Sequence, residues 1–247
     1  MSPETKNLAF RSSNNLLFQI YALCTFLFNI IYRDDRFGGN NVATTAASVS
    51  TYASLSSIGE PDLILSVGTA GGFAQRGACI GDVFLSTKCV FHARRIPEPS
   101  KTKHSNPNCV VLEEYGFGHF RSPNLIGLAH AAGLKQGVVT TSDSLDTTQK
   151  DMELMMAEGA TIKEMEATAV AWVCHNAGIP FAAIKSVTDI VDHIEEHNGS
   201  NITSAASTKE MFDSNFDLAV NALKEKVCRV LKLLNNSPLS TFAQIRF

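Results

Sequence analysis

Residues 163–189 read KEMEATAVAWVCHNAGIPFAAIKSVTD. Residues 167–176 are largely apolar and are followed by a glycine and a proline, which predicts a buried helix with a stop signal. Residues 181–187 form a second apolar run, which predicts a buried strand that ends at Asp189. The stretch therefore predicts a helix that leads into a strand, with carboxylates at both outer ends.

The same alternation continues on both sides of this stretch. Alternating strands and helices indicate an α/β fold with a largely parallel sheet, in which ligands bind beyond the strand ends. Short apolar runs predict strands, small or helix-favouring residues predict helices, and a proline-rich charged segment predicts a loop. The strands are expected at 63–67, 82–91 and 138–141, the helices at 41–58 and 149–157, and the loop at 94–108.

The C-terminal helix has the clearest pattern. Ser207 and Glu210 have the spacing of a capping box, which predicts a helix start at this point. Apolar residues at helical spacing follow between Phe212 and Leu234, so one face of this helix is expected to pack on the core.

Composition sets the class of protein. The chain has 247 residues with a net charge of −3, and 45% of them are hydrophobic, so it can bury a large core and is not disordered. It has no basic stripe, which argues against a nucleic-acid partner. The six cysteines are scattered without a CxxC pair, which argues against structural zinc and a disulfide scaffold and favours a reducing compartment.

The first 32 residues differ from the rest. Residues 16–32 are mostly apolar but shorter than the roughly 20 residues that a membrane-spanning helix needs. Three interpretations stay open, in this order: a buried strand or an atypical start, a signal or anchor, and an amphipathic surface segment. The expected division is an atypical segment at 1–32, a catalytic domain at 33–236 and a tail at 237–247.

Three segments with polar or glycine-rich sequence stand at predicted strand ends. They are GTAGG at 68–72, TSDSLD at 141–146 and TD at 188–189. GTAGG matches neither a dinucleotide fingerprint nor a P-loop, and it indicates either a tight turn or a backbone that a ligand approaches closely.

Two carboxylates are candidates for chemistry. Glu166, at a strand-to-helix junction, is either a partner of the helix dipole or an acceptor for the two hydroxyls of a sugar. Asp189, at the end of an apolar strand, is either a turn residue or a desolvated carboxyl that keeps its proton and acts as a general acid.

These motifs, in this order, resemble the 5′-methylthioadenosine/S-adenosylhomocysteine nucleosidases of the nucleoside phosphorylase superfamily, and two of them resemble the plant branch. The resemblance covers about residues 33–234. The matching segments are SVGTAGGF at 66–73, IGDVFL at 80–85, FHARRIP at 91–97, TTSDSLD at 140–146, EMEATAVAWVCHNAGIPF at 164–181 and KSVTDIVD at 185–192.

The resemblance implies a central mixed sheet, partly closed like a barrel and flanked by helices. It implies hydrolysis of an N-glycosidic bond in methionine salvage, which releases adenine and a thioribose without any metal or cofactor. It also implies a small-molecule nucleoside substrate and a homodimer. The composition and the scattered cysteines favour a cytoplasmic location without a nucleic-acid or membrane partner, beside the signal or anchor interpretation of residues 16–32.

The resemblance also assigns roles to individual residues. It implies that Asp189 protonates the purine and that Glu166 binds the ribose hydroxyls. The implied substrate-binding residues are Thr69 and Gly71 in the glycine segment, Leu145 stacked on adenine, Lys163 and Glu164 before Met165 under the sugar, and Lys185 close to the attacking water.

One family feature is not found. Family members have a glutamate after their first strand that activates the water, whereas Glu4 and Glu60 are the only glutamates before the glycine segment and neither follows a first strand. Either the start of the sequence is wrong or truncated, or the chain lacks this base and is weakly active or inactive.

Two other functions are weighed against the nucleosidase. A non-catalytic nucleoside-binding or storage relative would share the fold. A purine nucleoside phosphorylase would need a phosphate site, for which Arg94 and Arg95 offer charge, but the motifs at 140–146 and 164–169 match the nucleosidases better.

Overall fold

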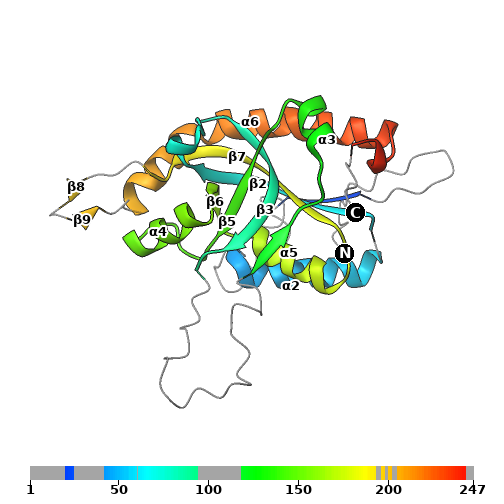
Figure 1. Ribbon diagram of the computed structural model, residues 1–247, viewed down its shortest axis with the longest axis horizontal. Coiled ribbons are helices and arrows are strands. Elements are labelled where there is room, and N and C mark those ends of the chain that lie inside the picture. The colour runs from blue at the N-terminus through cyan, green and yellow to red at the C-terminus, as the bar shows by residue number, and fades with distance from the viewer. Residues whose placement is uncertain are drawn as a thin grey trace, which may run out of the picture.

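The computed structural model describes residues 20–24, 42–59, 61–93, 118–192, 196–197, 200–201 and 205–242. Its centre is a seven-stranded mixed sheet, accompanied by a two-stranded ribbon (Figure 1). The strands are β1 (Ile20–Cys24), β2 (Leu63–Gly72), β3 (Val83–Phe91), β4 (His119–Arg121), β5 (Lys135–Thr141), β6 (Ala160–Glu164), β7 (Phe181–Ile190), β8 (Glu196–His197) and β9 (Ser200–Asn201). The α-helices are α2 (Ala43–Ile58), α3 (Ile126–Ala132), α4 (Gln149–Ala157), α5 (Ala167–Asn176) and α6 (Ala205–Asn236).

Five of the strands close on themselves. The ring runs β2, β6, β5, β3, β7 and back to β2, while β1 and β4 pair on its outside. Pairs β2–β7, β3–β5 and β5–β6 are parallel, and pairs β2–β6 and β3–β7 are antiparallel. The mixed, barrel-like sheet is therefore confirmed. The expectation of a largely parallel sheet is also confirmed, because the longest ladders, β2–β7 and β3–β5, are parallel, and two shorter antiparallel pairs close the ring.

Helices cover two sides of the barrel. In Figure 1, α6 and α3 lie along one side, and α2 and α5 lie together on the other. Successive residues of β2 point to opposite faces, as in any strand. Leu63 and Leu65 thus pack in the core cluster that contains residues of α3 and α6, whereas Ile64 packs in the cluster that contains residues of α5.

Two local expectations are corrected. The GTAGG segment is not a turn but the last part of β2, because it pairs with β7 on one side and β6 on the other. Helix α6 starts at Ala205, two residues before the start that was predicted at Ser207. Strand β4 and helix α3 were not expected, because each is too short to show a clear period. Strand β6 is the strand of the strand-to-helix junction that was predicted at Glu166.

The N-terminal segment is described only in part. Residues 20–24 form β1, which pairs in parallel with β2, as the strand interpretation predicts. Among the residues that the structure describes, no helix is long and apolar enough to cross a membrane. Glu4, Glu60, Arg94, Arg95 and the predicted loop at 94–108 lie outside the described residues.

Candidate active site

A cavity of about 520 Å³ opens at one end of the barrel. This volume lies in the range of roughly 300–1,000 Å³ that is usual for small-molecule sites. The end of β2, the segment after β5, the β6–α5 junction, the end of β7 and the first half of α6 all contribute to its lining. The predicted site residues that line it are Thr69, Gly71, Leu145, Lys163, Glu164, Met165, Glu166 and Asp189.

The strands meet at Gly71. In the sheet register, Gly71 is the partner of Lys163 on β6 and of Asp189 on β7. A Cβ atom built on Gly71 would lie 2.5 Å from Oδ2 of Asp189, so only glycine leaves room for this carboxylate. The register therefore brings together three segments that are far apart in the sequence.

Asp189 is buried, with 5% of its surface exposed. Burial raises the pKa of its carboxyl, and this effect outweighs the opposing effects of the Thr188 hydroxyl and the Lys163 charge. The Thr188 hydroxyl donates a 2.7 Å hydrogen bond to Oδ1 of Asp189. The site thus holds a carboxyl that tends to keep its proton and that faces a cavity.

Glu166 is also buried and occupies the N-cap position of α5, but its side chain makes no capping hydrogen bond. Its Oε1 accepts a 3.1 Å hydrogen bond from the backbone N–H of Ala43, at the start of α2. Burial and the neighbouring Glu164 raise the pKa of Glu166, and Lys185 opposes them. The side chain that would normally cap the helix is therefore held toward the cavity.

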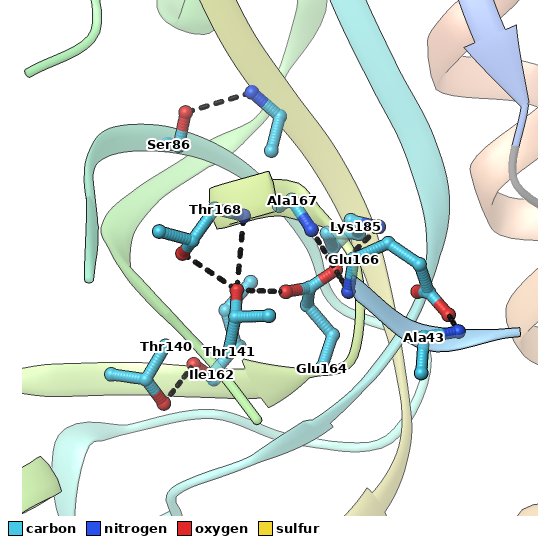
Figure 2. Close-up of polar contacts among 11 residues, drawn as sticks. Ala43, Ser86, Thr140, Thr141, Ile162, Glu164, Glu166, Ala167, Thr168 and Lys185 are labelled. Atoms are coloured by element: carbon cyan, nitrogen blue, oxygen red, sulfur yellow. Dashed lines mark hydrogen bonds and ion pairs between the residues drawn. The ribbon is translucent and has the colours of Figure 1, made fainter. Parts of the chain in front are cut away.

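Glu164 takes over the capping role (Figure 2). Its Oε2 accepts hydrogen bonds of 3.0 and 2.8 Å from the backbone N–H groups of Glu166 and Ala167. Its Oε1 accepts a hydrogen bond from the Thr141 hydroxyl, at the end of β5. Because a helix N-terminus favours a negative charge, Glu164 fixes the junction from which Glu166 projects.

Lys185 lies behind this junction. Its side chain is fully buried and its Nζ is 2.9 Å from Oε2 of Glu164. It is absent from the cavity lining, so it contacts Glu164 and not the space where a ligand would sit. Burial lowers the pKa of Lys185, but the carboxylates of Glu164 and Glu166 outweigh burial and leave the pKa raised.

Lys163 holds the segment after β5. Its Nζ donates 2.8 Å hydrogen bonds to the carbonyl oxygens of Leu145 and Asp146 and a 3.1 Å hydrogen bond to the Thr147 hydroxyl. Burial lowers the pKa of Lys163 to about 8. Leu145 is thereby fixed at the cavity with 41% of its surface exposed, which suits an apolar side chain that covers a ligand.

Sequence reasoning missed the contribution of two helices. The start of α2 reaches the site through Ala43, and Thr44 donates through its backbone N–H (2.8 Å) and its hydroxyl (2.9 Å) to Asp143. Helix α6 adds Thr208, Lys209, Phe212 and Asp213 to the lining. Their only sequence signal was the pattern of an amphipathic helix, which does not say what the helix covers.

No group of three or more histidine, cysteine, aspartate or glutamate side chains that could hold a metal ion occurs in the described part of the chain. The residues that line the cavity supply three buried carboxyls, a buried ammonium group and apolar surface, which suits a polar organic molecule with an apolar part.

Comparison with known proteins gives a consistent result. Residues 34–232 match the phosphorylase superfamily. A 5′-methylthioadenosine/S-adenosylhomocysteine nucleosidase of Arabidopsis thaliana is 39% identical over 211 residues, which are 84% of this chain and 73% of the relative. A 5′-methylthioadenosine nucleosidase of the same plant is 37% identical and covers 84% and 69% of the two chains.

Solved structures agree. The apo structure of an Arabidopsis thaliana 5′-methylthioadenosine nucleosidase superposes with a TM-score of 0.70 at 36% identity and covers 84% of this chain and 75% of that one.

Proposed function

Because the chain belongs to the phosphorylase superfamily, and within it to the 5′-methylthioadenosine/S-adenosylhomocysteine nucleosidases, we propose that it hydrolyses the N-glycosidic bond of 5′-methylthioadenosine to adenine and a thioribose. One observation carries the proposal. Asp189 and Glu166, from separate elements, line the same cavity as Thr69 and Gly71.

The chemistry requires a proton donor at the purine and a negative charge at the sugar. Cleavage develops positive charge on the sugar and negative charge on the leaving purine. Asp189 donates its proton to the purine, so that the base leaves neutral as the C–N bond breaks. The hydroxyl of a water molecule bonds to the anomeric carbon, and the remaining proton of that water returns to Asp189 through solvent.

Glu166 acts on the sugar. As an anion it accepts hydrogen bonds from the ribose hydroxyls, and its charge stabilises the cation-like transition state. Met165 packs under the ribose, Thr69 lies near it, and Leu145 covers the adenine. Lys163 and Glu164 position this set, the first through the segment at 145–147 and the second through the start of α5. Lys185 acts through Glu164.

The test is to incubate the purified protein with 5′-methylthioadenosine, with and without inorganic phosphate, and to measure adenine. The expected result is adenine release that does not depend on phosphate. Release only with phosphate would assign a phosphorylase, and no release in either condition would leave a nucleoside-binding relative as the better description.

We expect Gly71→Ala to lower kcat by about 100-fold, because the added methyl group would displace the Asp189 carboxylate and small displacements of a reacting group are costly. Gly72→Ala is the matched control. A Cβ there would lie 2.8 Å from Ala78 Cβ and from Val187 Cγ1, so it crowds the core and not the acid. Gly72→Ala should lower the melting temperature while the folded fraction keeps its kcat. Equal kcat losses in both variants would contradict the assignment.

We further propose that the unit at 33–236 works as a cytoplasmic homodimer. Val49 and Tyr52 are 63% and 70% exposed on α2, and exposed apolar side chains of this kind suit a subunit interface. The described cysteines Cys79, Cys89, Cys174 and Cys228 are free thiols, which suits a reducing compartment. Light scattering should give twice the chain mass of 26.7 kDa, and a monomer mass would contradict the dimer.

A further inference from the structure

The first residue of α2 has a strained backbone. Ala43 has a φ of 76°, and within the described ranges it is the one residue other than glycine whose φ is positive. This left-handed region disfavours alanine, because the Cβ atom comes too close to the following carbonyl oxygen. Strain of this kind persists only where the surrounding structure fixes it, so contacts from outside the residue must hold Ala43 in place.

Two carboxylates from other segments hold the first turn of α2. The Ala43 N–H donates a 3.1 Å hydrogen bond to Oε1 of Glu166 (Figure 2). The N–H and the hydroxyl of Thr44 donate to the two oxygens of Asp143, at 2.8 and 2.9 Å. Val42, at the N-cap position, makes no side-chain cap, and the first turn contains no acidic residue. The two carboxylates therefore supply the capping that the sequence of α2 itself lacks.

The strained geometry decides where the Ala43 N–H points. The body of α2 is fixed, because the helix packs against the core cluster that contains residues of α5. With the helix in place, a return of Ala43 to a negative φ would turn its N–H away from Glu166, because φ is the rotation about the N–Cα bond. The two hydrogen bonds from Thr44 to Asp143 oppose this rotation, since they fix the next residue of the turn.

The Ala43 N–H favours the ionised form of Glu166. Burial raises the pKa of Glu166, and the neighbouring Glu164 raises it further. Lys185 and the backbone N–H groups of Ala43 and Met165 lower it. Glu164 and Lys185 are the charged groups that act on this carboxyl, and α2 adds no charged side chain. The proposed reaction uses Glu166 as an anion, so a contact that keeps it ionised supports turnover.

We propose that Asp143 is a positioning residue for Glu166. By holding Thr44, it keeps Ala43 in its left-handed conformation and directs the Ala43 N–H at the carboxylate that binds the ribose. Asp143 stands between the end of β5 and Leu145, so the segment that covers the adenine also helps to fix the sugar-binding side of the site. This inference rests on the proposed nucleosidase function and adds a residue that acts on the site without lining the cavity.

The test measures the pH profile of kcat/KM for methylthioadenosine, by adenine release, in the full chain. Asp143→Ala should lower the maximum about 10-fold, the scale of one hydrogen bond to a charged group, and should move the fall in activity at low pH to higher pH. Asp143→Asn keeps an acceptor for the Thr44 N–H, so it should keep most of the activity and the wild-type profile. Ala43→Gly, added to Asp143→Ala, should recover part of the loss, because glycine adopts a positive φ without strain.

Asp151→Ala is the matched control. Asp151 accepts the same two kinds of hydrogen bond, from the N–H and the hydroxyl of Thr148, at the start of α4 and outside the cavity lining. Its loss should lower the melting temperature, as the loss of Asp143 does, but should leave the fall in activity at low pH where it is in the wild type.

A low-pH fall that stays in place in Asp143→Ala would overturn the positioning role and leave the proposed function intact. An equal shift in Asp151→Ala, or a double variant in which Ala43→Gly recovers no activity, would overturn it as well. A wild-type protein that releases no adenine from methylthioadenosine would overturn both the positioning role and the proposed function.

Discussion

Asp189→Asn should lower the turnover of methylthioadenosine by about 10²–10⁴-fold, the usual contribution of general acid catalysis. The amide keeps the size of the side chain and can still accept the hydrogen bond from the Thr188 hydroxyl, but it has no proton to give to the leaving purine. Substrate affinity should change little, because the ribose contacts of Glu166 remain. Adenine release measures the first effect, and calorimetric titration of the inactive variant measures the second.

The pH profile separates loss of the acid from general damage. Since the acid must be protonated, wild-type kcat/KM should fall as the pH rises through the pKa of Asp189, which burial places above the ordinary aspartate range. Glu166 must be ionised, so activity should also fall at low pH. The pH profile is then bell-shaped, and its two apparent pKa values belong to Asp189 and Glu166 together. Asp189→Asn should lose the alkaline limb.

The matched control is Asp217→Asn, the same change at an exposed position of α6. It should keep wild-type turnover and both limbs of the profile. If Asp189→Asn retains turnover within about threefold of the wild type, or keeps the fall in activity at high pH, then Asp189 does not donate the proton to the purine.

A feature of the fold could be predicted from the sequence where it is caused by residues that are close together in the chain. The place of Asp189 follows from an apolar run that ends in a carboxylate, and the helix at 167–176 follows from its composition, so both were found. The pairing of Gly71 with both Lys163 and Asp189 is a property of the closed ring, and nothing in the local sequence encodes which strands meet. The GTAGG segment was therefore mistaken for a turn.

The roles of the two neighbouring glutamates show the same limit. Their spacing at 164 and 166 marks a helix start, but either one can act as the cap. The contacts of Thr141 and Lys185, from two other strands, hold Glu164 at the backbone N–H groups and leave Glu166 to the cavity. Lys209 and Asp213 could not be distinguished from a solvated surface pair, because only the packing of α6 on the barrel turns them toward the cavity.

Lys185→Met should cost about 3–5 kcal/mol of unfolding free energy, because it leaves the Glu164 carboxylate buried without its cation. The double variant Glu164→Gln/Lys185→Met removes both charges and should recover part of this loss. Urea unfolding of the wild type, both single variants and the double variant gives the coupling free energy directly. Because Glu164 caps α5 beside Glu166, Lys185→Met should also raise KM in the fraction that remains folded.

The surface pair of Lys135 and Asp82 provides the control. Lys135 is about half exposed, so Lys135→Met should cost less than about 1 kcal/mol of unfolding free energy.

The stabilisation by Lys185 should depend on pH with a definite sign. The pKa of Lys185 is raised above the ordinary lysine value of 10.5, so its stabilisation is complete below that pH and is lost as the pH rises through the folded-state value. The difference in unfolding free energy between the wild type and Lys185→Met should therefore shrink across that alkaline range. A difference that stays constant would show that the Lys185 charge does not hold the junction and that the loss comes from packing alone.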